Sequence, residues 1–471
     1  MVFSSIPFLY YFLPAVMVVY FLLPKAVKNG WLLISSLVFY GWGEPRYVYL
    51  MIATILVCYC CGLGIGAAKK QSFRKLWLIL SIVVSLGFLV VFKYLGFFAE
   101  NFAALTGLSV PTLQIALPIG ISFYTFQCLS YTVDVYRGTA QVQKNPINFG
   151  AYVALFPQLI AGPIVRYVDV QKQLCSRQHT WEDAAVGMRR FLVGLSKKIL
   201  LADNFALVMQ MYRDAVQPSV LFSWMYALAV MLYIYFDFSG YSDMAIGLGR
   251  IMGLSFMENF NYPYMSKSVT EFWRRWHMSL GSWFRDYVYI PMGGNRVKKW
   301  RWVINILTVW LLTGFWHGAA WNFVLWGLMF ALLLLIEKWV PALQKLPAVL
   351  RHIYVLLLIC ISFVLFKATV VLPDGREVSS LLQAGEDLKA MFGFGGLPVV
   401  SAQTVYYLKS SAVLFLVGIL GATPLVRDLA RRVENTRLCS VLEPIVMLLL
   451  LIVCTAYLVD GSFSPFLYFN F

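Results

Sequence analysis

The chain alternates long apolar runs with short polar connections that are mostly basic. The first apolar run covers residues 6–23, and comparable runs follow at 48–65, 76–98 and 353–372. About 20 apolar residues are enough for an α-helix to cross the hydrocarbon core of a bilayer. The pattern therefore predicts an all-α polytopic membrane protein with about ten to twelve transmembrane helices, several of them tilted or broken.

Two stretches depart from simple spanning helices. Residues 154–163 are apolar but contain two prolines and a glycine, which predicts a re-entrant segment that is buried in protein or lines a cavity. Residues 272–287 carry large apolar side chains at spacings of three and four, opposite Arg274, Gly281 and Arg285. This second pattern predicts a helix lying in the membrane surface, with His277 at the boundary between its two faces.

Composition and charge add a location and an orientation. Hydrophobic residues make up 60% of the chain and charged residues 13%, which excludes an ordinary soluble domain. The net charge of +16 comes from basic clusters in the short connections, and such clusters face the cytoplasm. The acid-rich loop 373–401 is then external. Because no basic residue precedes 6–23 and no cleavage site follows it, we expect one integral-membrane domain over residues 1–471.

The cysteines predict neither disulfides nor a metal site. Most of the eight cysteines lie in apolar segments, where they behave as small hydrophobic side chains. No paired spacing of cysteine with histidine resembles a zinc site.

Two of the four histidines stand in dense aromatic surroundings within this apolar sequence. A helix that begins near the basic residue Arg301 carries His317 more than halfway across a core of about 30 Å, at a rise of about 1.5 Å per residue. An ionisable side chain at that depth is costly unless it faces a cavity or a partner. His317 and His277 are therefore candidates for one functional site.

Four motifs then occur in order along the chain. They are YFDFSGYSDMA at 235–245, NFNYPY at 259–264, FWRRWH at 272–277 and WHG at 316–318. Together they resemble the membrane-bound O-acyltransferase (MBOAT) family, most closely its bacterial alginate O-acetyltransferase branch. The turn at 39–45 and the ending at 465–471 extend the resemblance over nearly the whole chain. It implies the MBOAT fold, with re-entrant and interfacial helices around a central tunnel, in the bacterial cytoplasmic (inner) membrane.

The resemblance also implies roles for the two histidines. In the family, the histidine of the Trp-His-Gly motif is catalytic and an upstream polar residue accompanies it, which corresponds here to His317 and His277. An imidazole with a pKa near neutrality suits removal of a hydroxyl proton while an acyl group leaves a thioester. We assign the base to His317. His277 orients the donor, hydrogen-bonds the oxyanion or is itself the base, and the sequence leaves these three open. Since no Gly-x-Ser-x-Gly motif occurs, we expect direct transfer.

The expected acyl donor is acetyl-CoA, and we expect no permanently bound cofactor. Acyl-CoA carries phosphate charges and should dock on the basic inner surface. The candidate side chains are Arg274, Arg275, Arg285, Arg296, Lys298 and Lys299. The alternative for each of them is that it faces lipid phosphates and sets the orientation. The acceptor is expected to be an extracytoplasmic, alginate-like polysaccharide or a periplasmic acetyltransferase partner, and no nucleic acid is expected.

Other residues are expected to support the tunnel. Trp316 and Trp276 should pack around it, and Asn261, with its neighbours Asn259 and Tyr264, should form turns and lining. Asp237 and Asp243 should pair with Arg250 or hydrogen-bond to tunnel backbone, because unpaired carboxylates are costly in an apolar segment.

Two classes of function remain open at this point. Within acyl transfer, the alternatives to an exported polysaccharide are O-acetylation of peptidoglycan and transfer of D-alanine to teichoic acid. The second class is a non-catalytic transporter that moves an acyl donor or a glycan. A transporter would keep moving its substrate after His317→Ala and would transfer no label from acyl-CoA.

Overall fold

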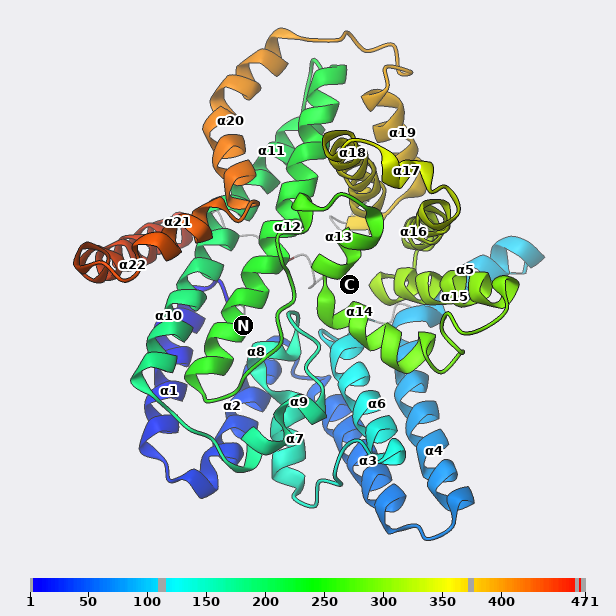
Figure 1. Cartoon of the computed structure of the whole chain (residues 1–471), viewed down its shortest axis with the longest axis vertical. Coiled ribbons are helices and arrows are strands. Elements are labelled where there is room, and N and C mark those ends of the chain that lie inside the picture. Colours follow the sequence, from blue (N-terminus) through cyan, green and yellow to red (C-terminus); the bar gives the residue numbers. More distant parts are fainter. Residues whose placement is uncertain (1–2, 109–115, 372–376, 462–465, 467–471) are drawn as a thin grey trace. The chain divides into compact units, whose positions relative to one another are not determined.

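The chain folds almost entirely into helices (Figure 1). The structure is a computed structural model that describes residues 3–108, 116–371, 377–461 and 466. The beginning of loop 373–401, the start of the predicted segment 113–133 and most of the ending 465–471 lie outside the described residues. Among the described residues, the only strands are β1 (Thr369–Val371) and β2 (Glu377–Ser379), which pair antiparallel with Val370 opposite Val378. The all-α class predicted from the sequence is confirmed.

The chain divides into two units. Unit 1 comprises Met1–Val193, Tyr241–Glu258 and Pro465–Phe471, and unit 2 comprises Gly194–Gly240 and Asn259–Ser464. Helices α10 (Trp181–Ser196) and α12 (Val220–Ile251) contribute residues to both.

Unit 1 is built from the N-terminal helices. Its further elements, with 3₁₀- and π-helices marked η, are η1 (Pro7–Phe12), α1 (Leu13–Leu22), η2 (Lys25–Val27), α2 (Lys28–Gly43), α3 (Val48–Ala67), α4 (Gln71–Leu89), η3 (Val90–Tyr94), α5 (Leu95–Thr106), α6 (Ile121–Arg137), α7 (Pro146–Ala154), α8 (Phe156–Leu159) and α9 (Tyr167–Cys175). Helix α3 packs against α4 and α6, and α2 packs against α7.

The apolar stretch 154–163 in unit 1 is broken and buried, as predicted. Helix α7 ends at Ala154, α8 has a single turn, and every residue from 151 to 165 is buried. Irregular backbone inside a protein needs hydrogen-bonding partners. Here side chains supply them: the amide Nε2 of Gln158 donates to the carbonyl of Tyr152 at 2.6 Å, and the hydroxyl of Tyr152 donates to the carbonyl of Val165 at 3.0 Å.

Unit 2 contains most of the predicted chemistry. Its further elements are η4 (Lys197–Ala202), α11 (Asp203–Arg213), η5 (Pro263–Met265), α13 (Val269–Arg275), α14 (Met278–Phe284), η6 (Arg285–Tyr289), α15 (Lys299–His317), α16 (Trp321–Trp339), α17 (Ala342–Lys345), α18 (Ala348–Lys367), α19 (Leu381–Met391), α20 (Ala402–Gly421), α21 (Leu425–Val433) and α22 (Arg437–Val459). Helix α16 packs against α13, α15 and α18, and α18 packs against α19.

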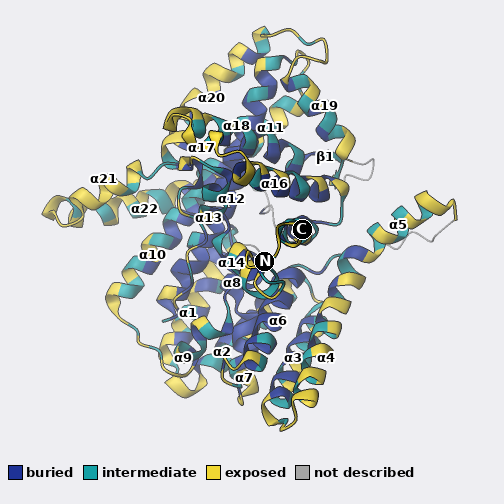
Figure 2. Cartoon of the chain, turned by 45° about the vertical axis from the view of Figure 1, so that its right-hand side comes forward, coloured by how far each residue is buried: buried dark blue, intermediate teal, exposed yellow. Residues whose placement is uncertain are grey.

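Seven helical stretches among the described residues are long and apolar enough to cross a membrane. They are Val48–Ala67, Gln71–Thr106, Val220–Ile251, Trp321–Trp339, Ala348–Lys367, Ala402–Gly421 and Arg437–Val459. The predicted ten to twelve segments also counted shorter helices and more polar ones, such as Pro7–Leu22 and α15. Burial separates the seven: 6% of the most apolar window of α22 is buried, against 78% in α12 (Figure 2). A helix that is apolar on all sides suits either lipid or a protein core.

Two glycines allow α15 and α16 to approach closely. A methyl group at Gly314 would collide with the backbone carbonyl of Phe323, and one at Gly327 would collide with that of Trp310. Small residues at such crossings are the usual means by which membrane helices pack tightly. The resulting hairpin fixes the end of α15, where His317 lies.

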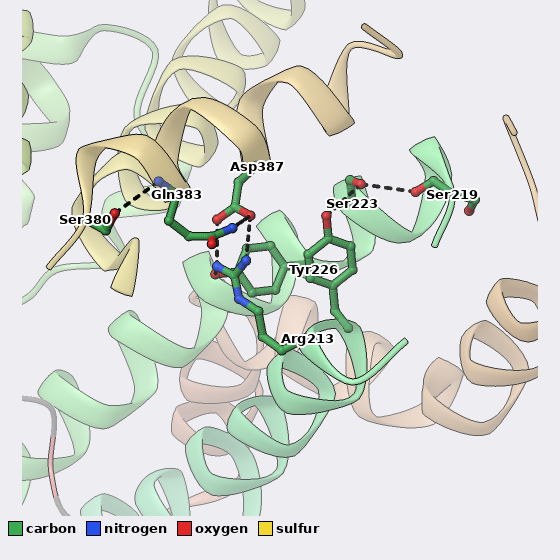
Figure 3. A network of polar contacts seen from close by, with 8 residues as sticks. Arg213, Ser219, Ser223, Tyr226, Ser380, Gln383 and Asp387 are labelled. Atoms are coloured by element: carbon green, nitrogen blue, oxygen red, sulfur yellow. Dashed lines mark hydrogen bonds and ion pairs between the residues drawn. The ribbon is translucent and has the colours of Figure 1, made fainter. Parts of the chain in front are cut away.

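A polar network holds α19 onto α11 and α12 (Figure 3). The guanidinium of Arg213 donates two hydrogen bonds of 2.6 Å to the carboxylate of Asp387 and one of 2.7 Å to the hydroxyl of Tyr226. The amide of Gln383 also donates to Asp387 at 2.9 Å. Such bidentate Arg–carboxylate pairs combine charge with fixed geometry.

The sequence predicted one continuous interfacial helix over 272–287, and this is wrong because the structure has two helices separated by a break at His277. Helix α13 ends at Arg275, His277 adopts a left-handed conformation with φ of 43°, and α14 begins at Met278. The predicted faces are nevertheless correct: Phe272, Trp276 and Leu280 are buried, whereas Arg274, Gly281 and Arg285 are exposed. The apolar face packs inside the protein because aromatic side chains from other helices of unit 2 cover it, among them Phe363 against Trp276.

Candidate active site

His317 is the last residue of α15, at the turn into α16. Its imidazole packs edge-on against Trp316, Trp326 and Phe366, with ring centroids 5.0 to 5.1 Å apart. The residue is 3% exposed. The sequence predicted a helix that carries this histidine into an apolar interior, and the structure confirms the helix and the burial.

His277 occupies the junction between α13 and α14. Two side chains, those of Ser268 and Glu337, accept hydrogen bonds from the first backbone N–H groups of α13. The Ser268 hydroxyl oxygen accepts from the backbone N–H of Glu271 at 2.9 Å, which is an N-cap. The carboxylate of Glu337, at the end of α16, accepts from the backbone N–H groups of Val269 and Thr270 at 2.6 and 3.0 Å. Glu337 therefore anchors α13, and with it His277, to the hairpin that carries His317.

The two imidazoles lie close together, as predicted. Their ring centroids are 6.5 Å apart, with 63° between the ring planes. Trp316 contacts both rings, at 5.7 Å from His277 and 5.0 Å from His317, and Phe238 packs edge-on against His277 at 4.6 Å. The pair therefore occupies an aromatic enclosure formed by α12, α15, α16 and α18.

The enclosure controls the charge of His277, which is 1% exposed. Burial, reinforced by the neighbouring His317, holds the pKa of His277 well below its usual value. Desolvation disfavours the protonated imidazole, and a second cation nearby would disfavour it further. Burial therefore favours the neutral form of His277, in which one ring nitrogen keeps a lone pair.

Asn259 contacts His277 directly, which the sequence did not predict. Its side-chain oxygen Oδ1 lies 3.1 Å from Nδ1 of His277 and also accepts from the hydroxyl of Ser279 at 2.8 Å. Both Asn259 and Ser279 are fully buried. Asn261, which was expected to form turns or lining, exposes its side chain and donates its backbone N–H to the carbonyl of Arg275 at 2.9 Å.

The two predicted tryptophans, Trp316 and Trp276, both pack against other aromatic rings. Trp316 touches both imidazoles, and Trp276 stacks on Phe272 with centroids 5.5 Å apart. Trp310 and Trp326 are also buried, whereas Trp321, at the start of α16, is half exposed.

The two predicted structural aspartates are paired, but not with Arg250. Asp237 pairs with the buried amine of Lys198 at 2.8 Å in unit 2, and Lys198 also pairs with Asp203 at 2.7 Å. In unit 1, Asp243 pairs with Arg190 at 2.9 Å. Arg250 instead contacts Asp183 at 2.9 Å. Both aspartates are therefore ion-paired, but with partners other than the predicted Arg250.

The six basic residues proposed for the acyl donor differ in their surroundings. Arg274, Arg296, Lys298 and Lys299 are exposed. Arg275 pairs with Glu271 at 2.8 Å and Arg285 pairs with Asp286 at 2.7 Å. The four exposed side chains without these ion pairs are therefore better placed to bind a phosphate than Arg275 and Arg285 are. Within the part of the chain that the structure describes, no three His, Cys, Asp or Glu side chains gather as a metal site would require.

Comparison with known proteins identifies the family. Residues 139–370 match the membrane-bound O-acyltransferase family. The chain is 43% identical over 403 residues to a probable alginate O-acetylase of Azotobacter vinelandii, covering 84% of this chain and 79% of that protein. A probable alginate O-acetylase of Pseudomonas putida is 37% identical with 100% of both chains covered, and a peptidoglycan O-acetyltransferase of Helicobacter pylori is 33% identical with 84% and 81% covered. The chain thus belongs to the membrane-bound O-acyltransferase family and is an acyltransferase.

Proposed function

We propose that this acyltransferase moves an acetyl group from cytoplasmic acetyl-CoA across the bacterial inner membrane to an extracytoplasmic polysaccharide of the alginate type, directly or through a periplasmic acetyltransferase. The observation that carries the proposal is the pair of buried imidazoles whose centroids lie 6.5 Å apart. The names of the two alginate O-acetylase relatives support the choice of acyl group and acceptor.

The proposed reaction needs one proton acceptor and a dry enclosure. The oxygen of the acceptor hydroxyl attacks the thioester carbonyl carbon while His317 takes the hydroxyl proton. The C–S bond then breaks, and the proton passes from His317 to the sulfur, which leaves as the thiol of CoA. The aromatic walls contributed by Trp316, Trp326 and Phe366 exclude water, which would otherwise hydrolyse the thioester.

Acyl-CoA would approach from the basic side of the protein. The exposed side chains Arg274, Arg296, Lys298 and Lys299 are the proposed contacts for its phosphates. The acceptor would reach His317 from the opposite face, so a narrow tunnel between the two surfaces is part of the proposal.

Purified protein in lipid vesicles, given acetyl-CoA labelled in the acetyl group, tests the proposal. We expect label to appear on an alginate-type polymannuronate or on a periplasmic acetyltransferase added outside, and none after His317→Ala. Hydrolysis of acetyl-CoA without label on either acceptor would contradict it.

Peptidoglycan is the second candidate acceptor, because the relative from Helicobacter pylori is named for that reaction. Label on peptidoglycan fragments but not on polymannuronate would select it. Transfer of D-alanine to teichoic acid is tested in the same assay with a D-alanyl donor. Transport of acyl-CoA or glycan with no transfer of label would select the transporter instead.

A further inference from the structure

We infer that Asn259 is a positioning residue that fixes the tautomer and the backbone of His277, so that Nε2 of the neutral ring is a hydrogen-bond and proton acceptor. The inference rests on the proposed acyl transfer for its consequence in catalysis. It removes one of the three roles left open for His277.

The first step identifies the Asn259 atom that faces the ring. The backbone N–H of Ser279 lies 3.3 Å from Oδ1 of Asn259, and the Ser279 hydroxyl donates to the same atom at 2.8 Å. A backbone N–H only donates, so its partner must be the carbonyl oxygen of the amide and not its NH₂ group. This contact settles the orientation of the amide, which is otherwise ambiguous.

The second step assigns the proton on the ring. Nδ1 of His277 lies 3.1 Å from the same Oδ1. The Ser279 hydroxyl lies 3.4 Å from the same Nδ1, but it gives its hydrogen to Oδ1 at 2.8 Å. Because Oδ1 has no hydrogen to give, Nδ1 is the donor. A neutral imidazole carries one N–H, so Nε2 holds the lone pair.

The third step concerns the backbone. The carbonyl of Asn259 accepts from the N–H of Met278 at 3.0 Å, and the N–H of Asn261 donates to the carbonyl of Arg275 at 2.9 Å. These bonds pair the segment 259–261 with the residues on both sides of His277. His277 and Tyr262 are the non-glycine residues with positive φ among the described residues, at 43° and 45°. Such conformations persist where the surrounding structure enforces them.

The consequence is a restriction on the chemistry of His277. Nε2 of the neutral ring has no hydrogen, so it cannot donate to the oxyanion that forms when the thioester is attacked. It can accept a hydrogen bond from the acceptor hydroxyl or take its proton. A carboxylate at position 259 would orient the ring equally well, but it would also favour the protonated imidazole. The neutral amide of Asn259 orients the ring without that effect.

A spectroscopic measurement tests the tautomer independently of activity. In protein labelled with ¹⁵N-histidine, we expect the signal that disappears in His277→Gln to show a protonated Nδ1 and an unprotonated Nε2. A protonated Nε2 at neutral pH would overturn the inference, whatever the acceptor or acyl group proves to be. Asn259→Leu should lose this preference, whereas Asn261→Leu, a matched control with an exposed side chain, should keep it.

Kinetics test the role. Asn259→Leu should lower kcat by about 10-fold or more, and by no more than His277→Ala does, because Asn259 acts through that ring. Asn261→Leu should stay within about twofold of the wild type.

Asn259→Asp keeps the accepting oxygen and adds a negative charge, so it should fold and raise the pKa of His277. A protonated Nε2 cannot accept a hydrogen bond or a proton from the acceptor hydroxyl, so activity falls as the pH drops through the pKa of His277. In Asn259→Asp, the acidic limb of the kcat/KM profile should therefore move to higher pH. An unmoved limb in Asn259→Asp, or equal losses in both Leu variants, would reduce Asn259 to a packing residue. If neither wild type nor any variant transfers acetyl groups while the ¹⁵N signals are as expected, the proposed function fails and the tautomer assignment stands.

Discussion

Two polar clusters of unit 2 show opposite ways of placing polar groups in an apolar protein. At the histidine pair, the amide of Asn259 holds the ring of His277, and both imidazoles are nearly inaccessible, at 1% and 3% exposure. In the Arg213–Asp387 network, full charges meet directly (Figure 3). The arginine side chain is 31% exposed and lines a hollow of about 390 Å³.

This difference between the two clusters suits the histidine pair to chemical reaction and the Arg213–Asp387 network to stabilising the fold. A charged pair satisfies itself, since each ion is the partner of the other and little capacity remains for a substrate. A neutral imidazole with an amide on one nitrogen keeps the other nitrogen for chemistry. Variants in the histidine cluster should therefore lose rate while the fold survives, and variants in the arginine network should lose stability while the rate survives.

The largest effect is expected from His317→Ala. Loss of a positioned base typically costs about 10²- to 10⁴-fold in rate, so acetyl transfer should fall at least 100-fold. The fold and membrane insertion should survive, although the cavity left among Trp316, Trp326 and Phe366 should lower the thermal unfolding temperature. Transfer within about twofold of wild type would remove His317 from catalysis.

His277 should give a large but smaller loss, and two variants separate the imidazole from the backbone. Asparagine tolerates the left-handed conformation at this position, whereas alanine does not. We expect both His277→Asn and His277→Ala to lower kcat, with weaker use of the acyl donor, and only the alanine variant to lose measurable stability. Kinetics unchanged in the asparagine variant would show that the ring has a structural role only.

Asp387→Asn should invert this pattern. Removing the carboxylate charge leaves the Arg213 guanidinium without its bidentate partner, which should lower the free energy of unfolding by about 1–3 kcal/mol. The rate per folded molecule should remain within about twofold. The matched control is Glu386→Gln on the same helix, whose exposed pair with Lys389 should matter by less than about 0.5 kcal/mol. A rate loss as large as that of His277→Ala would erase the distinction between the two clusters.

The smallest effect on activity is expected from a test of sidedness. After the native cysteines are replaced, cysteines at Lys299 and at Glu386 should both leave transfer near wild type. An impermeant thiol reagent should label position 386 in intact cells and position 299 only after the cytoplasmic face is opened. Reversed labelling would place the proposed donor surface outside and contradict transfer from cytoplasmic acetyl-CoA.

The sequence predicted those features that follow from hydropathy and from the cost of burial. The helical class, the break near Pro157 and the proximity of two buried histidines all follow from these rules. The periodicity of the large side chains from Phe272 onward continues past His277 without a gap, so it could not reveal the break there. Left-handed backbone has no hydropathy signal.

The residues that the sequence missed act through contacts between distant segments. Glu337 lies at the end of an apolar helix, where hydropathy gives no sign that it accepts hydrogen bonds from α13. Asn259 belonged to a motif interpreted as a turn, because its pairing with residues near His277 depends on the folded chain. The spacing of Ser268 and Glu271 was an available signal for the start of α13.

The left-handed backbone at His277 also limits how this position can evolve. Glycine, asparagine, aspartate and histidine adopt a φ of 43° more readily than other residues do. If the imidazole is replaced while the loop keeps its conformation, few residues fit without backbone strain. Among these, only asparagine and aspartate have a polar side chain. Diversification of the chemistry beside His317 would then pass through an amide or a carboxylate, and homologues with a bulky or β-branched residue here should have rebuilt the loop as well.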